Sequence, residues 1–165
     1  MSRPFVFLDR DGTLIEDRGY PFRVSDYAPL PGAYDAVAAL RRAGFGTAIV
    51  TNQSGIARGK FGEDDFARFQ AHLVADFAAH GAAFDAVYHC PHLPDAGCDC
   101  RKPRPGLLRR AERELGADLA ASWVIGNAES DVGLARAAGC SVVRIGEPGV
   151  PDIRAAASRV LAQAR

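Results

Sequence analysis

Short apolar runs alternate with longer amphipathic stretches along this chain, and the alternation limits the fold more than any other feature. The apolar runs have the length of buried strands and cover residues 5–8, 47–50, 84–88, 123–125 and 141–145. Helical spacing of apolar side chains, with Gly and Pro at the ends, predicts helices over residues 32–43, 63–80, 105–115 and 131–138 and a last one after Asp152. Strands that alternate with helices pair in parallel, so we expect an α/β fold with a doubly wound parallel sheet.

Length and charge narrow the class of protein further. The 165 residues suit one domain spanning 1–165, and no composition shift marks a linker. Lys plus Arg equals Asp plus Glu, 20 against 20, which disfavours a nucleic-acid partner. No apolar run reaches the length of a membrane span, and residues 1–4 lack the apolar core of a secretory signal. We expect a soluble, cytoplasmic monomer.

Polar side chains follow three of the predicted strands at once. Asp9 and Asp11 follow the first, Thr51 and Asn52 the second, and Asn127 and Asp131 the fourth. Parallel α/β sheets bind ligands outside the carboxyl ends of their strands. We therefore expect these residues to share one site.

Asp9 and Asp11 have the spacing of a catalytic carboxylate pair. If the extended backbone continues, both side chains point to one side, where their repulsion favours a nearby cation. Mg²⁺ held by carboxylates and a phosphate suits this arrangement. One carboxylate can then attack phosphorus while the other transfers protons. Gly12 permits a tight turn whose amides face phosphate oxygens. An Asp-x-Asp alone is more often a solvated acidic turn.

Two further segments fit a phosphoryl site. The Thr51 hydroxyl can donate to a phosphoryl oxygen, and the Lys102 ammonium can neutralise charge on the transferring group. Arg101 can grip a second anionic group with its guanidinium fork. The alternatives are an ordinary strand-to-helix loop at Thr51 and a solvated basic loop at residues 101–102.

Residues 90–100 contain a compact set of metal ligands. The set is Cys90, His92, Cys98 and Cys100. Three thiolates and an imidazole suit tetrahedral zinc, and four soft ligands so close together in a reduced protein favour zinc over free thiols. Protein atoms fill all four positions, so we expect a closed structural site that fixes the loop presenting Arg101 and Lys102. Cys140 lies outside the set, and His72, His80 and His89 have no matching partners.

Four stretches together carry a resemblance over nearly the whole chain. They read FLDRDGTLIEDRGY, TNQSGIARGKF, CPHLPDAGCDCRKPRPG and WVIGNAESDVGLARAAG. The chain resembles the haloacid dehalogenase superfamily of phosphohydrolases. Within it, the chain is similar to the D-glycero-D-manno-heptose 1,7-bisphosphate phosphatases and the histidinol-phosphate phosphatases. The resemblance implies a Rossmann-like fold with no separate cap domain and with a zinc-binding loop.

The resemblance also implies roles for individual residues. Asp9 would be the nucleophile, Asp11 the general acid/base, Thr51 a phosphoryl ligand and Lys102 the cation that orients Asp9. The implied substrate-binding residues are Asp17, Arg18, Gly19, Tyr20, Asn52, Gln53 and Ser54, with Arg101 on the distal part of the substrate. The implied magnesium ligands are the Asp9 carboxylate, the Asp11 backbone carbonyl and residue 127, and we also assign Asp131 to the magnesium site, by direct ligation or through another ligand.

Two features depart from the family pattern. After the fourth predicted strand, the family pattern is Gly-Asp followed by a basic residue, whereas this chain has Gly126-Asn127-Ala128. The change removes a negative charge from the magnesium site and a basic residue that would contact the substrate. The short spacing between His92 and Cys98 resembles the histidinol-phosphate enzymes, whereas residues 18–20, 53–59 and 103–106 resemble the heptose enzymes. We therefore expect a sugar bisphosphate substrate. The alternatives are a histidinol-phosphate phosphatase and, because of Asn127, a catalytically weakened protein that binds a phosphorylated metabolite.

Overall fold

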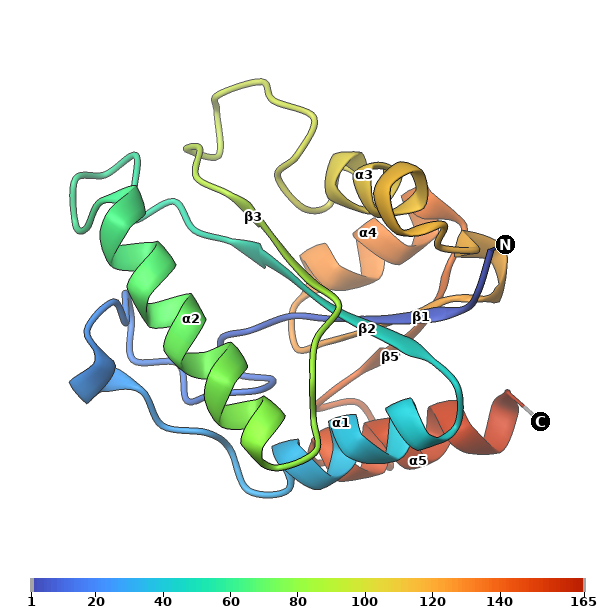
Figure 1. The fold of residues 1–165 in the computed structure, drawn as a ribbon. Coiled ribbons are helices and arrows are strands. Elements are labelled where there is room, and N and C mark those ends of the chain that lie inside the picture. Colours follow the sequence, from blue (N-terminus) through green and yellow to red (C-terminus); the bar gives the residue numbers. More distant parts are fainter. Residues whose placement is uncertain (1, 165) are drawn as a thin grey trace.

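The computed structural model describes residues 2–164 and confirms the predicted doubly wound parallel sheet (Figure 1). Its five parallel strands lie in the order β3-β2-β1-β4-β5. The strands are Phe5–Leu8 (β1), Gly46–Asn52 (β2), Ala86–Cys90 (β3), Trp123–Gly126 (β4) and Ser141–Arg144 (β5). The helices are Ala33–Arg42 (α1), Glu63–Ala79 (α2), Gly106–Leu115 (α3), Glu129–Ala138 (α4) and Ile153–Gln163 (α5).

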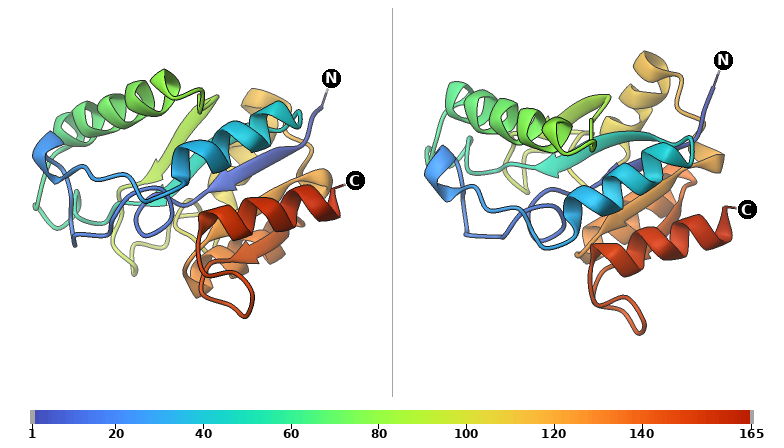
Figure 2. Two further views of the ribbon diagram at one scale, coloured as in Figure 1. Left: turned by 90° about the horizontal axis from the view of Figure 1, so that it is seen from below. Right: turned by 60° about the horizontal axis from the view of Figure 1, so that its bottom comes forward.

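Strand β1 occupies the centre of the sheet and is buried on both faces. Phe5 and Phe7 point into a core shared with α3 and α4. Val6 and Leu8 point into a second core shared with α1, α2 and α5. Alternation of side chains along a strand explains why one apolar run serves both cores. Helices α1 and α5 lie side by side against the second face (Figure 2).

Most element boundaries differ from the sequence prediction by one or two residues, and strand β2 runs on to Asn52, so that Thr51 and Asn52 end this strand instead of following it. Strand β3 begins at Ala86 because the main-chain N–H of Asp85 binds the Thr47 carbonyl and its carboxylate accepts from the Thr47 N–H. Helix α3 begins at Gly106, one residue after Pro105. Helix α4 begins at Glu129, so that Asp131 is its third residue and accepts from the Ala128 N–H. The structure also has 3₁₀ helices at Val24–Asp26 and Leu119–Ala121, which the sequence did not indicate.

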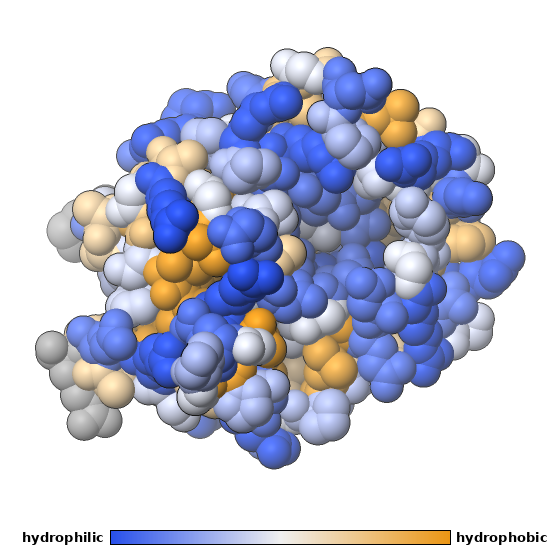
Figure 3. Space-filling model, turned by 180° about the vertical axis from the view of Figure 1, so that it is seen from behind, coloured by the Kyte–Doolittle hydropathy of each residue, from blue (hydrophilic) through white to orange (hydrophobic). Residues whose placement is uncertain are grey.

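Apolar side chains lie mostly in the two cores. Seen from behind, hydrophilic residues cover most of the surface, with apolar patches between them (Figure 3). Among the large hydrophobic residues described, only Tyr20 and Val24 are exposed. Within residues 2–164, no helix is both long enough and apolar enough to cross a bilayer.

The carboxylate of Asp76 ties α2 to α1 and to the loop that precedes α1. It accepts hydrogen bonds from the hydroxyls of Tyr27 and Tyr34. Burial alone would raise the pKa of Asp76, but these two hydrogen bonds outweigh it and hold the pKa below 3.8. The ionised form is therefore the one that stabilises the fold, and its contribution disappears as the pH falls below about 4.

We expect Asp76→Asn to lower the free energy of unfolding by about 1–2 kcal/mol at pH 7, because the two hydroxyls lose a charged acceptor. The difference from the unmodified protein should shrink at pH 3, because the stability contributed by the ionised carboxylate is progressively lost as the pH falls below about 4. Urea denaturation at both pH values measures it. Asp35→Asn, on the exposed side of α1, is the control and should change stability by less than about 0.5 kcal/mol. Equal effects of the two substitutions would contradict the prediction.

Candidate active site

The carboxyl ends of the central strands open into a cavity of about 290 Å³. The sheet brings together residues far apart in the sequence, as expected for parallel strands that end at one edge. The cavity is lined by Asp9, Asp11, Asp17, Gly19, Tyr20, Asn52, Gln53, Ser54, Lys102, Asn127, Ala128, Ser130 and Asp131. Most of the residues predicted to bind substrate therefore share one cavity with the two predicted catalytic carboxylates.

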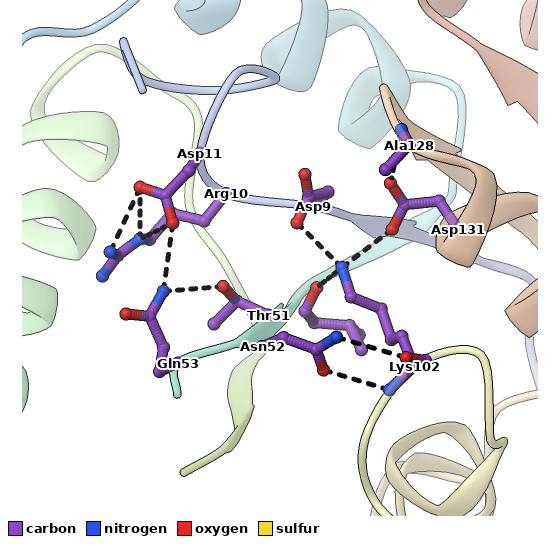
Figure 4. Close-up of polar contacts among 10 residues, drawn as sticks. Asp9, Arg10, Asp11, Thr51, Asn52, Gln53, Lys102, Ala128 and Asp131 are labelled. Carbon is purple, nitrogen blue, oxygen red and sulfur yellow. Dashed lines mark hydrogen bonds and ion pairs between the residues drawn. The ribbon is translucent and has the colours of Figure 1, made fainter. Parts of the chain in front are cut away.

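Lys102 lies at the floor of this cavity and is 5% exposed. Its ammonium donates to Asp9 Oδ1 at 2.8 Å, to Asp131 Oδ1 at 2.8 Å and to the Val50 carbonyl at 2.9 Å (Figure 4). All three hydrogens of the ammonium thus have acceptors. The lysine fixes the orientation of Asp9 at the end of β1.

Burial is the largest influence on the pKa values of both Asp9 and Lys102. It raises the pKa of Asp9 to about 6, with the Lys102 ammonium opposing the shift and the Asp131 carboxylate adding to it. Burial would lower the pKa of Lys102, but attraction to the two carboxylates outweighs it and raises that pKa. Lys102 is therefore charged, and its single positive charge faces two carboxylates. The remaining negative charge suits a further cation in the cavity.

Asp11 points away from Asp9, toward Arg10 and Gln53 (Figure 4). Gln53 donates from Nε2 to Asp11 Oδ2 at 3.0 Å and to the Thr51 hydroxyl at 2.9 Å. Arg10 donates to the same carboxylate from Nε at 3.3 Å and from Nη2 at 3.2 Å. Thr51 is fully buried and enters the site through its contact with Gln53.

The donor set around the first strand fits a hard cation. Asp9 and Asn127 supply side-chain oxygens to one cavity, and Gly12 has a φ of +79° that turns the backbone beside them. A Cβ built on Gly12 would lie 2.2 Å from Asn127 Nδ2, so the turn and the Asn127 side chain are in close contact. Both Asp131 oxygens already have partners, Lys102 and the Ala128 N–H, which favours a role in holding the lysine.

Several predicted substrate residues have other partners in the structure. Asn52 pairs with the main chain of Lys102, accepting from its N–H at 3.0 Å and donating to its carbonyl at 3.3 Å. Arg18 pairs with Glu16 outside the cavity lining. Arg101 also lies outside the lining and donates to the His92 carbonyl at 3.4 Å.

Sequence reasoning did not identify Arg10 or Ser130 as site residues. Ser130 lines the cavity from the first turn of α4, and no motif marked it. Arg10 had one signal, a charged side chain between the two carboxylates at the end of a buried strand.

The predicted zinc ligands meet at the end of β3 and in the loop that follows it. Cys90, His92, Cys98 and Cys100 each offer an atom, and these atoms all lie within 4.8 Å of one another. Cys90 Sγ lies 3.7 Å from Cys98 Sγ, close to the roughly 3.8 Å expected for two thiolates on one tetrahedral zinc. His92 Nδ1 lies 3.2 Å from Cys100 Sγ. The arrangement is compatible with a closed zinc site.

The chain is similar over nearly its full length to proteins of named activity. A protein of Vibrio cholerae named D-glycero-beta-D-manno-heptose-1,7-bisphosphate 7-phosphatase is 42% identical, covering 98% of this chain and 92% of that protein. The protein of that name from Escherichia coli K12 is 40% identical, covering 97% and 89%. The crystal structure of D,D-heptose 1,7-bisphosphate phosphatase from B. bronchiseptica, complexed with magnesium and phosphate, superimposes with a TM-score of 0.86 at 31% identity, covering 98% and 99% of the two chains.

A parallel sheet with paired carboxylates and a buried lysine at its carboxyl edge, in a chain with these relatives, defines an enzyme of the phosphatase class. A family model for haloacid dehalogenase-like hydrolases matches residues 17–139. The chain belongs to the haloacid dehalogenase-like hydrolases.

Proposed function

We propose that this enzyme removes the 7-phosphate of D-glycero-D-manno-heptose 1,7-bisphosphate through an aspartyl phosphate on Asp9. The proposal rests on the Lys102 ammonium, which holds Asp9 just after the carboxyl end of β1, in a cavity that Asp11 also lines. Relatives near 40% identity are named for this reaction on the β-anomer, which supports the choice of substrate. The neutral overall charge suits a small metabolite as the partner.

In the first step, the free oxygen of Asp9 attacks phosphorus, and the bond from phosphorus to the sugar oxygen breaks. Lys102 keeps Asp9 in position and offsets negative charge that builds up on the phosphoryl group. Asp11 gives a proton to the departing sugar oxygen. Thr51 was expected to be a phosphoryl ligand, but it is fully buried and lies outside the cavity lining, so we assign it the role of holding Gln53, which donates to its hydroxyl oxygen.

In the second step, water attacks phosphorus of the aspartyl phosphate and gives a proton to Asp11. The bond from phosphorus to the Asp9 oxygen breaks, so that phosphate is released and the Asp9 carboxylate is restored. We assign magnesium to the Asp9 carboxylate, the Asp11 carbonyl and Asn127, with Asp131 holding Lys102 beside it. Bound Mg²⁺ would supply positive charge to the phosphoryl oxygens. A neighbouring structure with magnesium and phosphate supports this choice of metal.

The test is phosphate release with magnesium from four substrates: heptose 1,7-bisphosphate, fructose 1,6-bisphosphate, histidinol phosphate and an aryl phosphate. We expect the heptose bisphosphate to be preferred. Preference for histidinol phosphate would instead support the alternative suggested by the short zinc loop. Tight phosphate-ester binding without turnover, even at high magnesium, would support the binding-protein alternative.

Asn127 should weaken magnesium binding, because an amide oxygen ligates without charge. We expect Asn127→Asp to tighten Mg²⁺ binding at least about tenfold, measured by calorimetric titration without substrate. Gln163→Glu adds the same charge at the exposed end of α5 and serves as the control. Equal magnesium affinity in the unmodified protein and in Asn127→Asp would refute the prediction.

We propose that the four-residue cluster binds one structural zinc ion. Cys100→Ser should then lose the metal from the purified protein and reduce thermal stability, since one of four protein ligands is gone. Cys140→Ser is the matched control, because Cys140 lies outside the cluster and burial raises the pKa of its thiol to about 11. Elemental analysis showing unmodified protein without zinc, or equal zinc in both variants, would contradict the assignment.

A further inference from the structure

We propose that Arg10 is a positioning residue that sets Asp11 for the hydrolysis of the aspartyl phosphate. The inference rests on the proposed function and adds to it a residue and a step. Arg10 presents Nε and Nη2 to the Asp11 carboxylate at 3.2–3.3 Å. Both residues belong to the turn that follows β1, so the contact acts directly on the side chain that transfers protons.

The Arg10 guanidinium is itself held in place from α2. Its Nη1 donates to Gln70 Oε1 at 3.2 Å, and its Cζ lies 4.8 Å from the Phe69 ring centroid and 5.8 Å from that of Phe66. Arg10 is 0% exposed and Gln70 is 5% exposed. A buried, stacked guanidinium with fixed partners has few alternative orientations, so it can hold a carboxylate in one position.

The side chain of Gln70 has one hydrogen-bond partner among the residues described, which is Arg10. Its Oε1 accepts from Arg10, while its Nε2 is buried without a partner in the part of the chain that the structure covers. Leaving a buried amide donor unpaired costs free energy. A residue placed here despite that cost is better explained by the orientation it gives Arg10 than by stability.

The donors around Asp11 hold its carboxylate in one position. Arg10 Nε, Arg10 Nη2 and Gln53 Nε2 all direct hydrogens at its carboxylate, which therefore acts as an acceptor toward each of them. The second step depends on that position, because there Asp11 takes the proton of the attacking water.

Arg10→Met tests this role, because methionine fills the apolar part of the site without the fork. With 4-nitrophenyl phosphate, nitrophenolate leaves without a proton from Asp11, so the burst of nitrophenolate should be retained at about one per enzyme. Steady-state turnover should fall about tenfold to a hundredfold, since general-base assistance is weakened. Acid-quenched protein should accumulate phosphate on Asp9, as mass spectrometry of the peptide would show.

Three further variants make the result decisive. Asp11→Asn should accumulate the same phosphorylated protein. Gln70→Met should accumulate it to a smaller extent, and this variant serves as the test if Arg10→Met does not fold. Phe77→Leu, in the core under the same helix, should lose stability without accumulating it. A burst and a turnover that fall by one factor in both Arg10→Met and Gln70→Met would overturn the inference. Unmodified protein that releases no phosphate would overturn the proposed function, and the role of Arg10 with it.

Discussion

Asp9→Asn should abolish phosphate release, with a loss of at least about 10⁴-fold, because the carboxamide cannot replace the attacking carboxylate. The variant should also form no phosphorylated protein under any condition. Phosphate release with magnesium and mass spectrometry of the acid-quenched protein measure the two effects. No other single substitution in this site should affect turnover so strongly.

The environment of Asp9 explains why no neighbour can take over its role. One of its oxygens is held by Lys102, and Asp11, the proposed general acid/base, points away from it (Figure 4). Asp64→Asn, at an exposed position in the first turn of α2, is the control and should retain normal turnover. Residual activity of Asp9→Asn above about 1% of normal would show that the nucleophile lies elsewhere.

Lys102→Met should damage both activity and stability. The ammonium compensates the Asp9 and Asp131 carboxylates, which are nearly buried. Removing one partner of a buried ion pair typically costs about 3–5 kcal/mol, so we expect a loss of about 3 kcal/mol in urea denaturation at pH 7. Turnover should fall about 10²-fold to 10³-fold, because a fixed positive charge is lost from the transition state.

A second substitution separates these two effects. Lys102→Met combined with Asp131→Asn removes one of the uncompensated carboxylates, so part of the lost stability should return while turnover stays low. Lys60→Met, which removes an exposed lysine, should leave both quantities nearly unchanged. Should the double variant be no more stable than Lys102→Met, the buried charges would not be the cause of the instability.

The sequence predicted the sheet well because its strands are apolar runs buried on both faces, as β1 shows. It predicted boundaries less well where side chains bind the backbone. Asp85 holds the Thr47 N–H and thereby keeps its own segment out of β3. Asp131 binds the Ala128 N–H from within the first turn of α4, so a residue taken as the start of the helix is its third.

Within the site, the contact between Lys102 and Asp9 was predicted, whereas the contacts of Lys102 with Asp131 and the Val50 carbonyl were not. Asn52 was expected to bind the substrate; it lines the cavity, and its side-chain amide also pairs with the Lys102 main chain across 50 positions of sequence. Such contacts depend on the relative placement of β2 and the loop after β3, which no local pattern encodes. Gln70 did leave a signal, as a polar residue on the helix face that also carries Phe66, Phe69 and Leu73.

The triangle of Asp9, Lys102 and Asp131 also bears on how the protein is made. Lys102 is 93 positions from Asp9 and 29 from Asp131 along the sequence. The ammonium can therefore offset the two carboxylates only after the chain has closed long loops. During synthesis, Asp9 and Lys102 emerge well before Asp131 does. A nascent chain that ends before α4 therefore lacks one corner of the triangle, and its lysine is not yet fixed in place. We therefore expect this site to be completed late, when most of the chain has been translated.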